Sequence, residues 1–330
     1  MDSRKIFLLG ATGTIGRATA QALVDSGHQV TALVRDRTGP GKHAATPASG
    51  SPVEGLDLRV GRPSDPWSLE HEGFRGQSFD VLVSCLASRT GAPRDAWAID
   101  YQAHLDALTV ARRHGVQHMV LLSAICVQKP LLEFQRAKLA FEAALIGSGV
   151  VYTIVRPTAF FKSLSGQFER VRQGKPFLLF GDGTLTRCKP ISDRDLGAFI
   201  AQCVVDANRH NKTLSIGGPG PAITPLDQGL KLFELLGREP RFRRVPVAVL
   251  DAVIAALSLA GRVSQVAADK AELARIGRYY ATESMLSLNP DTGAYDDALT
   301  PSAGHDTLFD HYAAMVRGEA QPDRGDHAVF

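Results

Sequence analysis

The chain has 330 residues, of which 44% are hydrophobic and 22% charged, and its formal net charge is +3. This composition is typical of a folded globular protein and excludes a disordered or collagen-like chain. The small positive excess is spread along the sequence without a long basic run. We therefore expect an acidic small molecule, and no nucleic acid, as the partner.

Neither the cysteines nor the histidines indicate a metal site, so none is predicted. The four cysteines match no zinc, iron–sulfur or CxxC spacing and are expected to be reduced cytoplasmic thiols: Cys85, Cys126, Cys188 and Cys203. Three histidines of the central segment have no partners at metal-ligand spacing and are expected in surface or capping roles: His104, His114 and His118.

The chain contains no obvious targeting or membrane-spanning segment. The N-terminus runs directly into a short apolar strand, without a signal h-region or an Arg/Ser-rich transit segment. No run of 18 uncharged apolar residues is present. The nearest candidate, residues 245–261, is interrupted by Asp251 and is predicted to be a packed helix. A cytoplasmic location is expected, and peripheral contact of this helix with a photosynthetic membrane stays open as the alternative.

Apolar, β-branched runs alternate with helical periods through the first half of the chain. The runs are residues 5–10, 29–34, 56–60, 79–85, 116–123 and 150–155. This alternation predicts an α/β protein with a Rossmann-type doubly wound parallel sheet. Residues 36–55 are rich in Gly, Pro, Ser and Ala and are predicted to form a surface loop within the domain.

The strict alternation ends after residue 155, which suggests a second, smaller lobe. We expect residues 1–157 to form an NADP-binding domain, completed by a helix and a strand in about 189–216. Residues 158–188 and 217–330 are expected to form a mostly helical substrate-binding lobe. The number of subunits stays open.

A glycine-rich turn follows the first predicted strand. Gly10, Gly13 and Gly16 give the spacing GxxGxxG at the start of the first helix. Glycine lets the chain turn tightly and lets a pyrophosphate approach the backbone, while the helix N-terminus attracts the anion. In this strand–turn–helix context the motif predicts dinucleotide binding. The predicted cofactor loop comprises Gly10, Thr12, Gly13, Thr14, Ile15, Gly16 and Arg17.

The residue after the second strand favours NADPH over NADH. An Asp or Glu there would hold the ribose 2′-hydroxyl of NAD, but this chain has Arg35. Its guanidinium suits a 2′-phosphate, and Arg17 could share that charge. A solvated surface arginine beside Asp36 is the alternative.

Several polar residues end the predicted strands at one edge of the sheet. Ser84 and Cys85 close the fourth run, Ser123 the fifth, and Pro157 and Thr158 the sixth. Ligands of open parallel sheets bind beyond the carboxyl ends of the strands, so we expect these residues to line the cofactor crevice.

The helix after the fifth run resembles the short-chain dehydrogenase/reductase superfamily in its extended or atypical branch. The Ser and Tyr-x-x-x-Lys frame of that superfamily falls on Ser123, Phe134 and Lys138. The resemblance implies that Lys138 binds the nicotinamide ribose, that the loop after Pro157 binds the carboxamide, and that Ser123 and Lys138 are catalytic. A solvated helix lysine and a core hydroxyl are the alternatives for these two residues.

Phe134 departs from the superfamily frame because a phenyl ring cannot donate a proton. A carbonyl reductase needs such a donor, since hydride addition places negative charge on one oxygen. A carbon–carbon double bond conjugated to a large π-system spreads that charge over many atoms. Phe134 is therefore compatible with reduction of a conjugated double bond, with water or Lys138 supplying the final proton.

Four longer segments, residues 121–145, 152–167, 271–286 and 300–318, resemble the NADPH-dependent divinyl chlorophyllide 8-vinyl-reductases. The resemblance spans essentially the whole chain and includes the Phe-x-x-x-Lys pattern. It implies reduction of the 8-vinyl group of 3,8-divinyl (proto)chlorophyllide a to ethyl in (bacterio)chlorophyll synthesis. The missing transit segment suggests a bacterial member. The alternatives are a non-catalytic NADP(H)-binding redox sensor or assembly subunit, and an isoflavone-reductase-like enzyme acting on another conjugated molecule.

A planar tetrapyrrole needs a broad aromatic and aliphatic pocket with few charges. Half of the aromatic candidates are expected to be ordinary packing, and Lys162 is a candidate partner for the pigment's propionate. The predicted substrate-binding residues are Phe134, Phe160, Phe161, Lys162, Tyr279 and Tyr280.

Overall fold

The computed structural model describes residues 3–35 and 53–320, so most of the predicted loop at 36–55 lies outside the described residues. The apolar runs form a seven-stranded parallel sheet with the order β3-β2-β1-β4-β5-β6-β8. Four of the five residues of β1 are buried, as expected for a strand covered on both faces. The predicted fold class is confirmed. The strands are β1 (Lys5–Leu9), β2 (Gln29–Val34), β3 (Leu56–Val60), β4 (Val81–Ser84), β5 (His118–Leu122), β6 (Val151–Pro157) and β8 (Lys212–Ile216).

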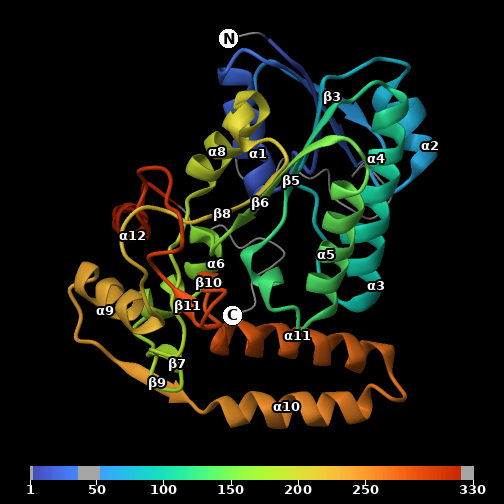
Figure 1. Cartoon of the computed structure of the whole chain (residues 1–330). Helices are drawn as coiled ribbons and strands as arrows, with labels where there is room; N and C mark the ends of the chain where they lie inside the picture. The colour runs from blue at the N-terminus through green and yellow to red at the C-terminus, as the bar shows by residue number, and fades with distance from the viewer. Residues whose placement is uncertain (1–2, 36–52, 321–330) are drawn as a thin grey trace.

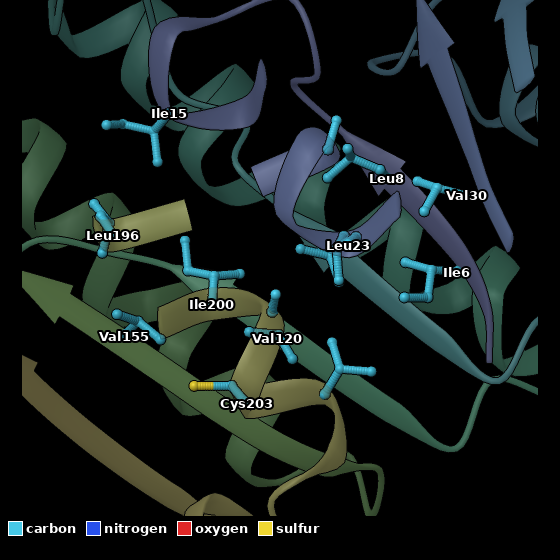
Figure 2. Packing of buried hydrophobic residues seen from close by; sticks show 14 of the residues in the cluster. Ile6, Leu8, Ile15, Leu23, Val30, Val120, Val155, Leu196, Ile200 and Cys203 are labelled. Atoms are coloured by element: carbon cyan, nitrogen blue, oxygen red, sulfur yellow. The ribbon is translucent and has the colours of Figure 1, made fainter. Parts of the chain in front are cut away.

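Helices cover both faces of the sheet (Figure 1). On one face, α1 (Thr14–Asp25) packs against α8 (Asp193–Val205), and their apolar side chains meet those of the central strands (Figure 2). Ser192 caps α8 by accepting a hydrogen bond from the Asp195 N–H at 3.0 Å, and the helix predicted within about 189–216 is confirmed. The helix and the following β8 return the chain to the sheet beside β6.

The opposite face carries the helices that follow β4 and β5. Here α4 (His104–Arg113) and α5 (Glu133–Ile146) bury aliphatic and aromatic residues against the sheet. Short elements complete the connections on this face. They are α2 (Pro66–Ser68) and the π-helical segment Leu69–Phe74 between β3 and β4, α3 (Pro93–Ala96) and the π-helical segment Trp97–Ala103 between β4 and α4, and the 3-10 turn Ile125–Gln128 between β5 and α5.

The remaining segments build a second cluster outside the sheet. In it, β7 (Phe177–Phe180) pairs with β9 (Phe242–Val245), and both lie near α9 (Pro225–Leu235). Phe168, Phe233 and Tyr312 fill its core, and the Tyr312 hydroxyl donates to the Leu164 carbonyl at 2.8 Å. The other elements of this region are α6 (Phe161–Leu164), α7 (Phe168–Arg172), β10 (Ser287–Leu288), β11 (Tyr295–Asp296) and α12 (Leu308–Arg317). The 3-10 turn Ala207–Arg209 instead connects α8 to β8.

A helical hairpin of α10 (Val247–Ala260) and α11 (Gln265–Thr282) crosses the lower edge of the molecule (Figure 1). The predicted helix at 245–261 is confirmed, and it packs along α11. Within residues 3–35 and 53–320, no helix is long and apolar enough to cross a bilayer.

Candidate active site

The loop between β1 and α1 has the geometry of a phosphate-binding turn. Gly10 has a φ of +81°, and a Cβ there would lie 2.5 Å from the Cys85 carbonyl carbon. A Cβ on Gly16 would lie 2.0 Å from the Gly10 oxygen. Gly13 occupies the N-cap position of α1 and has no side chain to cap the N–H groups of the first turn. A helix that begins in this way suits the pyrophosphate of a dinucleotide.

The other predicted loop residues differ in their exposure and in their hydrogen bonds. Thr12 is exposed, whereas Ile15 is buried and belongs to the core beneath the loop (Figure 2). The Thr14 hydroxyl accepts a hydrogen bond from the Lys162 ammonium at 2.8 Å. The sequence predicts Lys162 at the pigment carboxylate, but the structure places its charge at the N-terminus of α1.

Arg35 lies immediately after β2, which is the neighbour of β1 in the sheet. It is exposed, and residue 36 onward lies outside the described residues. Arg17, in the first turns of α1, is half-buried. Both arginines are thus at the end of the sheet where the glycine loop lies, as a 2′-phosphate site requires.

Lys138 is held by a buried carboxylate that the sequence analysis did not single out. Its ammonium donates to Asp100 Oδ1 at 2.9 Å, and the Asp100 side chain is fully buried. Asp100 also accepts hydrogen bonds from Ser88, from the hydroxyl at 2.6 Å and from the backbone N–H at 3.2 Å. Lys138 is therefore oriented toward the sheet and is not a solvated helix lysine.

The Asp100 carboxylate stays ionised despite its burial. Burial alone would raise its pKa, but the positive charge of Lys138 and the hydrogen bond from Ser88 outweigh burial, so the pKa lies below its usual value. The π-helical segment Trp97–Ala103 turns Asp100 inward, between the end of β4 and α5.

Ser123 is paired with a second buried carboxylate. Its hydroxyl donates to Glu142 Oε1 at 2.5 Å, and the other Glu142 oxygen accepts from the Arg156 guanidinium. Glu142 is buried, while Arg156 is in β6 beside the end of β5. Because the Ser123 proton is directed at Glu142, this hydroxyl is not a proton donor to the crevice.

Ser84 and Cys85 end β4 in different environments. The His104 Nδ1–H donates to the Ile99 carbonyl at 2.8 Å, so Nε2 accepts the Ser84 hydroxyl proton at 2.9 Å. Burial raises the pKa of the Cys85 thiol to about 12, which excludes a thiolate nucleophile. The Cys85 and Leu86 backbone, and not the thiol, faces Gly10.

The surface or capping role predicted for the histidines is wrong for His104 and His118. Both are at least nine-tenths buried, because His104 packs against Phe141 of α5 and His118 packs against His210. Burial and the nearby Lys138 charge lower the pKa of His104 to about 4. His118 is also kept neutral, since burial and the neighbouring His210 lower its pKa to about 3.

The end of β6 is fixed by backbone contacts. The Thr158 N–H donates to the Ile216 carbonyl at 2.9 Å, and its hydroxyl donates to the Lys189 carbonyl. Pro157 is the last residue of β6. The two residues therefore lie at the same sheet edge as Ser123, where the sequence places the carboxamide-binding loop.

The predicted substrate aromatics separate into two groups. Phe161 packs in the second cluster, where its ring centroid is 5.5 Å from that of His311. Phe160 packs against the core between α8 and the sheet. Both side chains thus contribute to packing clusters, and their contact with a substrate stays a prediction. Phe134, Tyr279 and Tyr280 instead lie where α5 meets α11.

Phe134 faces an apolar cluster under α11. Only 8% of Phe134 is exposed, and it shares the cluster with Ile276 and Tyr279. The Tyr279 hydroxyl donates to the Cys126 carbonyl at 2.9 Å, which ties α11 to the turn before α5. Tyr280 is 38% exposed, although burial of its hydroxyl, 3.9 Å from the Cys126 sulfur, raises its pKa.

The gap beside Lys138 is small. It has essentially no room for a water-sized molecule, whereas ordinary small-molecule sites enclose roughly 300–1,000 Å³. The broad pocket predicted for a flat pigment is thus not formed by the described residues at this point. The gap is lined by Asp100, His104, Leu121, Leu122, Ser123, Lys138 and Phe141.

Sequence reasoning missed Asp100, His104 and Glu142. Asp100 and His104 are four residues apart at the start of the helix after β4, and Glu142 is four residues after Lys138. The four-residue spacing from a candidate lysine could have drawn attention to Glu142, whereas Asp100 is 38 residues from Lys138 and no spacing connects the two.

Comparisons with known proteins agree with this geometry. Residues 10–207 match the NAD(P)H-binding family. The solved structure of an NADPH-dependent quinone oxidoreductase from Escherichia coli, in complex with NADPH, has the same fold with a TM-score of 0.65. It is 20% identical, and the match covers 94% of this chain and 99% of that one.

Sequence similarity to plant enzymes is much higher. The chain is 47% identical over 332 residues to the chloroplastic divinyl chlorophyllide a 8-vinyl-reductase of Arabidopsis thaliana, covering 97% of this chain and 79% of the relative. It is 48% identical over 333 residues to the enzyme of that name from Cucumis sativus, covering 98% and 79%. The chain therefore belongs to the divinyl chlorophyllide a 8-vinyl-reductase family.

Proposed function

We propose that this protein uses NADPH to reduce the 8-vinyl group of a divinyl chlorophyllide or protochlorophyllide a to an ethyl group. The observation that carries this proposal is the 47% identity, over 97% of the chain, to an enzyme named for that reaction. The glycine loop and the crevice at the ends of β4, β5 and β6 supply the matching cofactor site. The protein works in the cytoplasm in this proposal, and its four cysteines are free thiols.

The described residues fit the cofactor. Gly10 and Gly16 leave room for a pyrophosphate against the backbone. The Lys162 ammonium, which donates to the Thr14 hydroxyl, adds a positive charge beside the first turn of α1. Arg35 and Arg17 would bind the 2′-phosphate, while Pro157 and Thr158 would bind the carboxamide. When bound, NADPH supplies the hydride that is added to the vinyl carbon.

Lys138 would bind the nicotinamide ribose, with Asp100 as its positioning residue. The 2.9 Å ion pair fixes the ammonium at the crevice, and Ser88 fixes Asp100. Ser123, Glu142 and Arg156 form a second hydrogen-bonded group of three residues behind the site. Their contribution is orientation, because the Ser123 proton is already engaged by Glu142.

Phe134 is consistent with a substrate whose charge is delocalised. An apolar ring offers no hydrogen bond to a developing oxyanion, and none is needed when a macrocycle spreads the charge. Its neighbours Ile276 and Tyr279 keep this side of the site apolar. Water or the Lys138 ammonium would supply the final proton.

The pigment would enter between α5 and α11. In this proposal, residues 1–157 and about 189–216 bind the cofactor, and residues 158–188 and 217–330 form the substrate lobe. Because the gap beside Lys138 is small, α11 must move outward before a macrocycle can reach the site. The apolar contacts of Phe134 with α11 would be exchanged for contacts with the pigment.

A product spectrum tests the proposal. Purified protein is incubated with NADPH and divinyl chlorophyllide, and the Soret band is followed together with chromatographic separation of the product. We expect a blue shift as one vinyl group leaves conjugation, and no shift with an Asp100→Asn/Lys138→Met variant. Binding of NADPH without its consumption, with both chlorophyllide and protochlorophyllide, would instead identify a non-catalytic NADP(H) sensor.

A further inference from the structure

Helix α10 is apolar and has no buried residue. Its fourteen residues, Val247–Ala260, include Asp251 and Ser258 as the polar ones, yet none is buried. An apolar helix in a globular protein normally turns one face into a core. Figure 1 shows α10 as the outermost element at the lower edge, with α11 between it and the body of the molecule.

The exposed side chains form one continuous stripe along α10. Val249, Val253 and Leu259 are 48%, 43% and 64% exposed, and Val263, just after the helix, is 92% exposed. These positions, with the exposed alanines at 252, 256 and 260, recur at intervals of three and four residues. They therefore lie on one face of the helix.

The opposite face of α10 is fixed on α11 by polar contacts. Arg278 of α11 pairs with Asp251, and Arg275 donates to the Ser258 hydroxyl at 2.7 Å. The acid of the helix is thus neutralised on the α11 side. The exposed stripe carries no charge that would oppose burial in an apolar medium.

Arginines flank the stripe at both ends. Arg241, Arg243 and Arg244 precede the helix on and beside β9, and Arg262 follows it, and all four are exposed. Exposed acids also occur in this region: Glu239 shortly before Arg241, Asp182 near Arg244, Asp251 paired with Arg278, and Asp269 in the first turns of α11. The surface therefore combines an apolar centre with arginines at both ends, among which acids are interspersed.

We propose that this surface docks the protein on a lipid bilayer that contains anionic headgroups. Apolar side chains of a surface helix insert at the boundary between headgroups and acyl chains, while flanking arginines bind lipid phosphates. The inference goes beyond the reductase activity and does not depend on it.

A second copy of the chain fits this surface less well. A fourteen-residue helix is about 21 Å long, and a stripe about 10 Å wide would bury roughly 200 Å² per partner. Stable interfaces bury about 800 Å² per partner. A symmetric pair would also bring the arginines at the two ends toward each other.

Docking in this orientation would place the substrate entrance near the lipid surface. Helix α11 contacts α10 on one side and contributes Ile276 and Tyr279 to the cluster around Phe134 on the other. An apolar pigment could then pass from the bilayer to the crevice. This consequence rests on the proposed function, whereas the lipid contact itself does not.

Vesicle flotation tests the proposal. The full chain is floated with vesicles of phosphatidylcholine alone and with vesicles that contain phosphatidylglycerol as well. We expect the protein to float with the mixed vesicles, and we expect a Val253→Glu/Leu259→Glu variant to lose at least about tenfold of that binding. An Arg243→Glu/Arg244→Glu variant should lose binding to the mixed vesicles more than to the neutral ones.

Matched controls separate this surface from others. Leu58→Glu and Leu230→Glu change residues that are 52% and 43% exposed elsewhere, and Arg112→Glu/Arg113→Glu changes exposed arginines of α4. These variants should float like the unchanged protein. All variants should keep the unchanged NADPH affinity and thermal unfolding, so a loss of flotation is separate from a failure of the reductase assignment.

Three results would overturn the inference. They are no flotation with either kind of vesicle, equal flotation of the α10 variants and the unchanged protein, and a concentration-dependent doubling of mass that Val253→Glu/Leu259→Glu abolishes. The last would assign the stripe to a second copy of the chain.

Discussion

The phosphate loop and the crevice around Lys138 lie at the same edge of one sheet, but they are built from different groups. The loop is made by backbone within residues 10–17, where Gly10 and Gly16 approach other backbone atoms closely. The crevice is made by side chains from distant segments, with Asp100 on Lys138 and Glu142 on Ser123 and Arg156. A backbone site depends on the space that glycine leaves, whereas the crevice depends on charges that are buried in pairs.

The largest expected effect is at the loop. In Gly16→Ala the new Cβ would lie 2.0 Å from the Gly10 oxygen, so the turn must open. We expect about 1–3 kcal/mol of lost stability from the overpacking and at least about a hundredfold weaker NADPH binding. Gly13→Ala is the stability control, because its Cβ would meet the Gly10 oxygen at 3.5 Å. Calorimetric titration and denaturant unfolding measure both effects, and unchanged NADPH affinity in Gly16→Ala would contradict the loop assignment.

The next effect tests the buried pair. Lys138→Met should slow turnover about a hundredfold and lower the free energy of unfolding by about 3–5 kcal/mol, because Asp100 is left as a buried unpaired charge. Asp100→Asn/Lys138→Met should recover most of the stability without recovering turnover. If the double variant regains turnover, Lys138 has a structural role alone.

Arg35 tests the choice of cofactor. Arg35→Asp removes a cation and adds an acid where the 2′-phosphate would bind, so NADPH affinity should fall about tenfold or more while NADH affinity changes little. Fluorescence titration with both cofactors measures the ratio. Equal losses for the two would show that Arg35 does not contact the phosphate.

His104 gives a pH-dependent effect. Its pKa is lowered to about 4 in the folded protein, against 6.5 for the free side chain. Between these values the unfolded chain binds a proton that the folded protein does not, so acid destabilises the fold, by about 3 kcal/mol once the pH is below 4. Unfolding free energies measured from pH 7 to pH 4 should therefore fall less steeply in His104→Gln. An unchanged slope would contradict the neutral, buried state of His104.

The smallest expected effect is at Phe134. In Phe134→Tyr a hydroxyl would be added next to an apolar cluster and a delocalised substrate, so turnover should change less than about twofold. Steady-state kinetics on divinyl chlorophyllide measure this. A large gain would mean that the reaction does need a phenolic proton donor.

The contrast between the two regions explains what the sequence could predict. The alternation of strands and helices and the GxxGxxG turn depend on residues that are close along the chain, so the parallel sheet and the phosphate loop were predictable. The partners of Lys138 and Ser123 depend on which faces of η2 and α5, the segments Trp97–Ala103 and Glu133–Ile146, turn inward. Glu142 follows Lys138 by one helical turn, but this spacing does not show that its carboxylate is buried or that it contacts Ser123, 19 residues earlier.

Lys162 and Phe161 illustrate the same limit. They are neighbours in α6, and the run of aromatic and basic residues around them suggests a pigment pocket. In the structure Phe161 fills the second cluster and Lys162 contacts Thr14, which is 148 residues away. Adjacent side chains of a helix point in different directions, and tertiary packing decides which neighbours each of them contacts.

The central claim is that NADPH held in this crevice reduces the vinyl group directly. The most direct measurement is a single-turnover reaction with NADPH deuterated at the nicotinamide C4, on the transferred face, followed by mass spectrometry of the pigment. We predict one deuterium in the new ethyl group of the product. An ethyl product that carries no deuterium with either C4 epimer of the cofactor would contradict the account.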